Sequence, residues 1–228
     1  MLFHDNPDII KADCETIQGG EALKRSKTKV WKNGGYIVVE NTLEKDRIIR
    51  MVTEEKAEQV LSIYAPYVME TAVTFEYEVP SPAQMRERIR HTLEKYPWLA
   101  IYEEGEMAGY AYVSPFKERA AYDWAVETSI YIKKEYQGKG IGKYLYEELE
   151  TILKKQHILN VNACIAWPNP QSVAFHERLG YRTAAHFTEC GYKFGKWYDM
   201  IWMEKMLGEH QPEPEPFLPI GQLLEKTV

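Results

Sequence analysis

The sequence predicts an α/β fold built on a mixed β-sheet, and three observations lead to this prediction. The chain has 228 residues, and 45% of them are hydrophobic, which is enough for a sizeable core in one large domain. Between residues 47 and 207, strand and helix patterns alternate, as in folds whose helices flank a sheet. Two strands, Trp98–Tyr102 and Met107–Val113, are joined by a tight turn at Glu104–Gly105, so part of the sheet is expected to be antiparallel.

The first half of this region is expected to hold a strand and two helices. Ile48–Val52 is the strand, and Thr53 is expected to cap the helix that follows. The apolar residues of that helix recur at spacings of three and four: Ala57, Val60, Leu61, Tyr64 and Val68. Ser81–Gln84 has the layout of a capping box, with proline at the first helical position. The helix that it starts has one apolar stripe, formed by Met85, Ile89 and Leu93.

The second half contains the strongest helix pattern of the chain. A strand at Val126–Ile132 leads into this helix, whose apolar positions are Ile141, Leu145, Leu149, Ile152 and Leu153. A strand at Val161–Ala166, a helix at Gln171–Leu179 and a long aromatic strand at Trp197–Met203 complete the predicted domain.

Three segments follow from these patterns. Residues 1–46 form an N-terminal extension, in which Val30–Val39 predicts a short hairpin turning at Asn33–Gly34. This extension is either a loosely packed appendage or a dimer or regulatory arm. Residues 47–207 form the main domain, and residues 208–228 form a proline-rich tail that is expected to be extended.

Charge and cysteine content argue against several classes of protein. The net charge of −6 and the pI of about 5.6 disfavour a nucleic-acid or anionic-membrane partner. No apolar run approaches the roughly 20 residues that span a bilayer, and the N-terminus lacks the pattern of a signal peptide. Cys14, Cys164 and Cys190 form no C-x-x-C pair, which predicts a reducing, cytoplasmic location. The histidines lack ligand spacing, so no metal site is expected.

The most informative stretch is a glycine-rich turn between the strand that ends at Ile132 and the strongest helix. A helix N-terminus presents unpaired N–H groups and the positive end of the helix dipole. Glycines let the backbone wrap closely around a phosphate oxygen, and two lysines add positive charge. The turn is therefore expected to bind a pyrophosphate through Gln137, Gly138, Lys139, Gly140, Ile141, Gly142 and Lys143.

The glycine spacing of this turn can be compared with the known phosphate-binding motifs. It fits neither the Walker pattern nor the dinucleotide G-x-G-x-x-G pattern. It reads Q-x-x-G-x-G, and Asn169-Pro170-Gln171-Ser172 follows downstream, before Phe175-His176-Glu177 and Leu179-Gly180-Tyr181. With both motifs in place, the sequence resembles the GNAT superfamily of acyl-CoA-dependent N-acetyltransferases, whose coenzyme A pyrophosphate loop is Q/R-x-x-G-x-G/A.

Further segments resemble one family within that superfamily, the phosphinothricin or methionine sulfoximine N-acetyltransferases. The resemblance covers about Ile48–Leu207, and residues 1–46 have no counterpart in it. The segments that carry it are Tyr96–Leu99, Pro115–Trp124, Val126–Ser129, Gly191–Lys193 and Trp197–Asp199.

The resemblance implies a fold and a coenzyme. The fold is a central, mostly antiparallel sheet flanked by helices and splayed at the coenzyme-binding strand. Acetyl-CoA is the implied co-substrate, and its pantetheine arm is expected to pair with that strand as an added strand would. The thioester carbonyl would then be polarised by backbone N–H groups of Ile130, Tyr131 and Ile132.

Acetyl transfer to an amine needs a base, and Glu127 is the candidate. It lies on the strand that leads to the pyrophosphate turn, and strand alternation puts it on one face with Ser129 and Tyr131. Loss of hydration in an aromatic cleft makes a carboxylate more basic. The glutamate of the V-E-[ST] motif has the proposed role of base in the resembled family, through a water. The alternative is a strand-end carboxylate paired with lysine or arginine.

The departing thiolate also needs stabilisation, and His176 is the candidate for this role. It stands where many GNAT proteins carry tyrosine, seven residues after Asn169. His176 would either hydrogen-bond the sulfur and donate a proton or only position the coenzyme. Asn169 and Ser172 are expected to bind the coenzyme at the start of a helix.

The residues that are expected to select the acceptor substrate are Phe75, Lys117, Arg119 and Tyr122. Phe75 lies in a loop after the first helix and suits the capping of a small substrate. Two cations, Lys117 and Arg119, suit an anionic acceptor such as an amino-acid carboxylate. Without the family resemblance, solvated surface charge would be the preferred interpretation of this pair.

These expectations combine into an N-acetyltransferase that moves acetyl from acetyl-CoA to the α-amine of a small amino acid, such as phosphinothricin or methionine sulfoximine. Transfer is expected to be direct, in a ternary complex, and the protein is expected to be a homodimer. The alternatives are a non-catalytic acyl-CoA-binding module and an enzyme that acetylates a polyamine or a protein.

Overall fold

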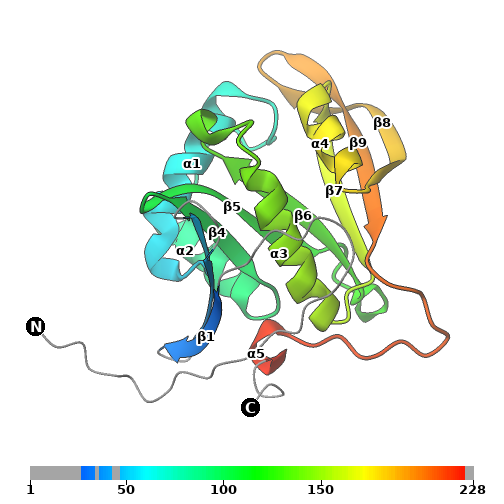
Figure 1. Ribbon diagram of the computed structural model, residues 1–228. Helices are drawn as coiled ribbons and strands as arrows, with labels where there is room; N and C mark the ends of the chain where they lie inside the picture. The colour runs from blue at the N-terminus through cyan, green and yellow to red at the C-terminus, as the bar shows by residue number, and fades with distance from the viewer. Residues whose placement is uncertain (1–26, 34–35, 43–46, 224–228) are drawn as a thin grey trace, which may run out of the picture.

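One nine-stranded sheet organises the computed structural model, in the order β1-β2-β3-β4-β5-β6-β7-β9-β8 (Figure 1). The structure describes residues 27–33, 36–42 and 47–223, and for the first two ranges the backbone alone. All neighbouring strands are antiparallel except β6 and β7. This confirms the predicted mixed, mostly antiparallel sheet. The strands are β1 Lys27–Asn33, β2 Tyr36–Thr42, β3 Arg47–Met51, β4 Trp98–Glu103, β5 Glu106–Pro115, β6 Ala125–Ile132, β7 Asn160–Trp167, β8 Arg182–Lys193 and β9 Lys196–Met206.

Helices cover both faces of this sheet. The helix α3 packs against one face with buried side chains such as Leu145 and Leu149, and α1 and α2 cover the other face through Val60, Tyr64 and Ile89 (Figure 1). The helices are α1 Ala57–Glu70, α2 Pro82–Leu93, α3 Ile141–Lys155, α4 Pro170–Arg178 and the short α5 Ile220–Leu223. Three 3₁₀ helices are η1 Glu54–Lys56, η2 Ala120–Tyr122 and η3 Lys134–Tyr136. No described helix is long and apolar enough to cross a membrane.

Local signals explain most of these boundaries. Ser81 and Gln84 form the predicted capping box at the start of α2, with side chain and backbone paired in both directions. The β4–β5 turn has Glu104 and Gly105 at positive φ, which a tight two-residue hairpin turn requires. Thr53 does precede η1, but its side chain makes no capping hydrogen bond, so the capping prediction is wrong there.

The region before residue 47 contributes strands to the same sheet. β1 and β2 pair in register from Asn33↔Tyr36 outward, as the predicted hairpin requires, and β2 pairs with β3. Residues 34–35, at the predicted turn, lie outside the described residues, as do 1–26 and 43–46. The limits of the extension and of the tail therefore stay predictions.

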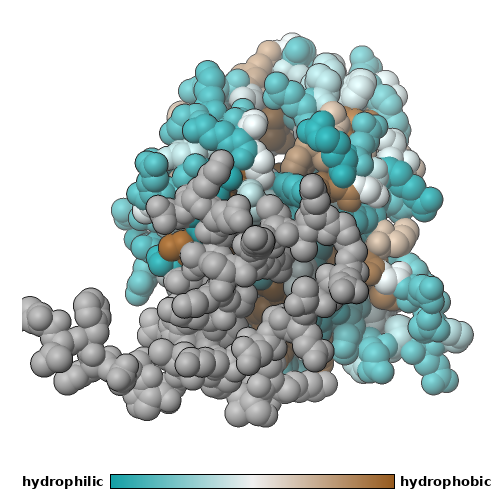
Figure 2. Space-filling view, in the orientation of Figure 1, coloured by the Kyte–Doolittle hydropathy of each residue, from teal (hydrophilic) through white to brown (hydrophobic). Residues whose placement is uncertain are grey.

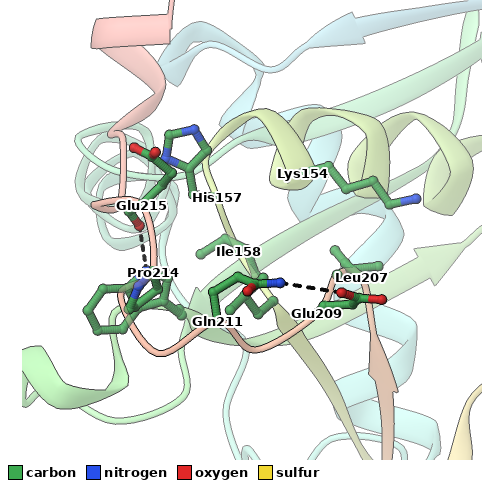
Figure 3. Close-up of a pocket in the computed structure, with 11 residues that line it drawn as sticks. Lys154, His157, Ile158, Leu207, Glu209, Gln211, Pro214 and Glu215 are labelled. Carbon is green, nitrogen blue, oxygen red and sulfur yellow. Dashed lines mark hydrogen bonds between the residues drawn. The ribbon is translucent and has the colours of Figure 1, made fainter.

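The tail that begins at residue 208 packs against the main domain. Gln156, at the end of α3, is fully buried and donates to the carbonyls of Lys95 (2.7 Å) and Leu218 (2.9 Å). Trp124 donates through its indole N–H to the carbonyl of Glu215 (2.7 Å). Between tail and domain lies a cavity of about 310 Å³, shown in Figure 3 with Lys154 on one side and Gln211 on the other.

We expect Gln156→Ala to lower the free energy of unfolding by about 1–3 kcal/mol, because two buried carbonyls lose their donor. Urea denaturation measures this change. Gln59→Ala, at an exposed position of α1, is the control and should stay within about 0.5 kcal/mol of the parent. Equal stability of the two variants would show that Gln156 does not hold the tail.

Candidate active site

The centre of the candidate site is the place where β6 loses its second neighbour. β6 pairs with β7 from Ala125 to Thr128, whereas it pairs with β5 along its whole length to Ile132. β7 pairs with β9 along its whole length on its other edge, from Asn160 to Trp167, whereas its pairing with β6 ends at Ala163. The sheet therefore opens between β6 and β7, which confirms the splay expected of a GNAT fold.

The register fixes which backbone groups face this opening. Lys133 donates its N–H to Ala108 (3.0 Å), so the odd-numbered residues of β6 hydrogen-bond to β5. The even-numbered residues direct their N–H and C=O groups to the other edge. Ile130 is thus the residue whose backbone faces the opening, and Tyr131 faces β5. Of the three amides predicted to polarise a thioester, Ile130 is best placed.

Ile132 faces the same edge but already has a partner. The hydroxyl of Tyr67, on α1, donates to the carbonyl of Ile132 (2.6 Å) and accepts from its N–H (3.3 Å). This tyrosine was not among the residues expected at the site. The sequence signal for it is weak, because Tyr67 lies beside the apolar stripe of α1 and not within it.

The predicted pyrophosphate turn leads from η3 into α3. Gly138 and Gly140 have φ of 73° and 79°, a region that favours glycine, and both are exposed. The first amides of α3 follow at Ile141, where no side chain caps the helix. Gln137 donates to the Tyr67 hydroxyl (3.0 Å), so it braces the turn against α1. The turn thus has the unfilled helix start that binds phosphate oxygens.

Lysines and close helix packing complete this turn. Lys139 lies over the ring of Tyr136, and the ammonium group of Lys143 is 3.8 Å from Glu147. Gly142 is buried, and a Cβ atom there would stand 3.0 Å from the ring of Phe175 on α4. The start of α3 therefore packs closely against the middle of α4 at a position where residue 142 lacks a side chain.

The second motif forms the start of α4. Asn169 is the N-cap residue, and its side-chain oxygen accepts from the N–H of Ser172 (3.2 Å). Asn169 and Ser172 were both predicted to bind the coenzyme, and the side-chain oxygen of Asn169 already caps the helix. Ser172 is half-buried, and its carbonyl accepts from Nδ1 of His176 (2.8 Å).

His176 lies in the interior, between α3 and α4. Its side chain is 2% exposed, and its Nε2 is 3.0 Å from the hydroxyl of Tyr146. Because Nδ1 bonds to a carbonyl, it carries the proton of the neutral ring. Burial lowers the pKa of His176, and the bond to Ser172 only partly offsets this shift. Both nitrogens are used internally, so the geometry favours the positioning role over the role of acid.

Glu127 lies on β6 opposite Ser114 of β5. Burial raises the pKa of its carboxyl, and the nearby Lys117 acts in the opposite direction. On the same face, Ser129 hydrogen-bonds Tyr112, and the ring of Tyr131 packs among tyrosines. This is the common face that strand alternation predicted. A half-buried carboxylate with raised basicity next to the opening can accept a proton from an amine.

The predicted acceptor residues divide between two loops. Phe75, between α1 and α2, lies against Gly191, where a Cβ atom would be within 2.4 Å of its ring, and 6.1 Å from the ring of Tyr198. The other three lie between β5 and β6: Lys117 acts on Glu127, and Arg119 and Tyr122 are exposed. The structure therefore brings Lys117 toward Glu127, whereas Phe75 packs against residues of the β8–β9 hairpin.

A buried lysine holds the Phe75 loop and was also missed. Lys193 is 1% exposed and donates to the carbonyls of Val68 and Thr74, each at 2.7 Å. Burial lowers the pKa of Lys193, whereas Glu76 opposes this shift. A hydrogen bond from Tyr77 to the carbonyl of Tyr192 (2.6 Å) adds a second link between loop and hairpin.

The cavity beneath the tail lies outside this site. It is at the C-terminal end of α3, whereas the glycine-rich turn is at the N-terminal end of that helix. Within the described residues, no group of three His, Cys, Asp or Glu side chains could hold a metal ion.

Comparison with known proteins identifies the family. The model of the acetyltransferase (GNAT) domain matches residues 49–202, which include the β6–β7 opening and both motifs. The chain therefore belongs to the GNAT acetyltransferase family.

Individual relatives have amino-acid substrates in their names. The phosphinothricin N-acetyltransferase of Streptomyces viridochromogenes is 34% identical and aligns with 77% of this chain and 95% of its own. The L-methionine sulfoximine/L-methionine sulfone acetyltransferase of Salmonella typhimurium is 28% identical, over 71% and 95%. The crystal structure of a phosphinothricin acetyltransferase from Sinorhizobium meliloti in complex with AcCoA superposes with a TM-score of 0.71, at 34% identity, over 73% of this chain and 92% of that one.

Because Lys117 stabilises the charged form of Glu127, Lys117→Met should raise the pKa of this carboxyl. The acidic limb of the pH profile of kcat/KM should then move to higher pH, since the base form appears only above the raised pKa.

The matched control is Lys196→Met. Lys196 lies over the ring of Tyr198, as Lys117 lies over the ring of Phe116. Its acidic limb should stay in place. An acidic limb that Lys117→Met leaves unmoved would mean that Glu127 does not set it.

Proposed function

We propose that this protein transfers the acetyl group of acetyl-CoA to the α-amine of a small amino acid, with phosphinothricin and methionine sulfoximine as the first acceptors to test. The observation that carries the proposal is on β6. The strand presents the backbone of Ile130 at the opening and, three residues earlier on the same strand, the carboxylate of Glu127.

The residues have complementary roles in this proposal. The glycine-rich turn and the start of α3 would hold the pyrophosphate of the coenzyme. The N–H of Ile130 would polarise the thioester carbonyl. Glu127 would accept, directly or through a water, the proton that the acceptor ammonium loses before its nitrogen attacks the carbonyl carbon. The carbon–sulfur bond then breaks, the sulfur leaves with the electron pair, and the nitrogen gives its second proton to the thiolate or to water as the amide forms.

The acceptor class is supported by charge and by the relatives. Lys117 supplies a cation that acts on Glu127, and the exposed Arg119 stands two residues later in the same loop, which suits an acceptor with a carboxylate. The named relatives act on small amino acids. A polyamine would instead require an anionic groove, and it is the main alternative that the assay below includes.

The assay follows coenzyme A release with a thiol reagent in the presence of acetyl-CoA and a panel of amines. We expect release with phosphinothricin or methionine sulfoximine, and less with spermidine or a lysine peptide. No release with any amine, although acetyl-CoA binds, would favour the non-catalytic binding module.

We expect Glu127→Gln to lower kcat about 10²- to 10⁴-fold, the usual contribution of a general base. Affinity for coenzyme A, measured by calorimetry, should change less than twofold, because Glu127 lies on the acceptor side. Glu118→Gln, which changes an exposed carboxylate in the loop between β5 and β6, is the control. A kcat for Glu127→Gln equal to that of the control would remove Glu127 from the role of base.

We also propose a homodimer. The tip of the β8–β9 hairpin exposes Tyr192, Phe194 and Trp197 by 45%, 56% and 59%, beside the loop that carries Phe75. The face that Figure 2 shows is mostly hydrophilic above the grey residues, so such a cluster is unusual for this surface. A second copy that covers the aromatic tip would explain its exposure.

Light scattering coupled to gel filtration should report twice the monomer mass for the parent protein. Trp197→Glu should shift it toward monomer, whereas Met206→Glu, at the far end of β9, should not. A monomeric parent protein would refute the dimer.

A further inference from the structure

Two tyrosines one turn apart on α1 face the two halves of the candidate site. Tyr64 and Tyr67 both pack edge-on against Tyr131, with ring centroids 4.9 Å and 5.1 Å away. Their hydroxyls diverge. Tyr64 bonds to the hydroxyl of Thr74 (2.8 Å), in the Phe75 loop, and Tyr67 bonds to Ile132 at the open edge of β6.

The hydroxyl of Tyr67 uses its full hydrogen-bonding capacity. It donates one bond, to the carbonyl of Ile132, and accepts two, from the N–H of Ile132 and from the side chain of Gln137. A phenol hydroxyl has one donor and at most two acceptor positions. A single atom therefore satisfies the last backbone pair of the open edge and holds the first residue of the glycine-rich turn.

The surroundings fix this hydroxyl in place. The ring of Tyr67 contacts Tyr131. The backbone carbonyl of Tyr67 accepts a hydrogen bond from the hydroxyl of Thr71 (2.7 Å), just after α1. Gln137 also reaches the carbonyl of Ile132 (3.3 Å), so the turn, the strand and the helix meet at one point.

We propose that Tyr67 is a positioning residue for the coenzyme. By occupying the N–H and C=O of Ile132, it leaves Ile130 as the place on the open edge where an amide-bearing ligand can pair as a strand does. This inference rests on the proposed function, because it assumes that the arm of coenzyme A is that ligand.

The physical reason is register. Without the hydroxyl, the N–H of Ile132 would lose its partner and its carbonyl would keep only the bond from Gln137. Ile132 would then become a second pairing position, two residues or about 6.6 Å along the strand from Ile130. An arm paired at the wrong position would carry the thioester away from Glu127. Gln137 would lose a partner at the same time, and the pyrophosphate turn would be held less firmly.

The experiment compares Tyr67→Phe with Tyr64→Phe, which removes the same atom from the same helix. Tyr67→Phe should raise the Kd of coenzyme A in calorimetry about three- to tenfold, as the loss of one hydrogen bond predicts, and should lower kcat. The KM of the amino-acid acceptor should change little. Tyr64→Phe should do the reverse, raising the acceptor KM and leaving the Kd of coenzyme A within twofold.

Hydrogen exchange on the unaltered protein provides a test that does not depend on how the variants fold. The Ile132 amide should be protected without coenzyme A, and the Ile130 amide should become protected only when it is added. Protection of both only after addition would overturn the inference. So would a Kd for coenzyme A that Tyr67→Phe leaves unchanged. If the parent protein binds no coenzyme A, the proposed function itself fails, which is a different result.

Discussion

The structure of the site depends on one constraint, the loss of a strand partner by β6 after Thr128. Backbone N–H and C=O groups need hydrogen-bond partners when they lie inside a protein, and a strand edge offers them in pairs two residues apart. Tyr67 satisfies the pair of Ile132, and β7 satisfies the edge as far as Thr128. What remains between them is a single backbone position, that of Ile130. The fold thus creates a ligand position by leaving one gap in a hydrogen-bond ladder.

The start of α3 packs against β6 at this gap. Gly142 lies close to Phe175 and to the side chain of Ile130, which would be 3.3 Å from a Cβ atom at residue 142. The first turn of α3 therefore sits directly over the point where β6 and β7 separate. Because that turn also ends the glycine-rich segment, the opening and the predicted anion site are positioned by the same contact.

The sequence predicted the elements with strong local signals and missed those set by distant partners. The capping box at Ser81 and the apolar stripe of α3 need only neighbouring residues, and both were found. β8 was missed because it is an edge strand whose residues are almost all exposed, so it has no alternating pattern. Tyr67 and Lys193 act through backbone carbonyls far along the chain, and no local pattern reveals such bonds.

Glu127 and His176, the two candidate catalytic residues, show that burial affects an acidic and a basic side chain in opposite ways. Burial disfavours the charged form of each, raising one pKa and lowering the other. For a base, this shift is useful as long as the carboxylate stays accessible, and Glu127 is only half-buried. For an acid, the shift is adverse, and the nitrogens of His176 are already bonded to Ser172 and Tyr146. A thiol with an ordinary pKa of about 8.5 is a competent leaving group without protonation. The proposed chemistry therefore requires help with the amine more than with the sulfur.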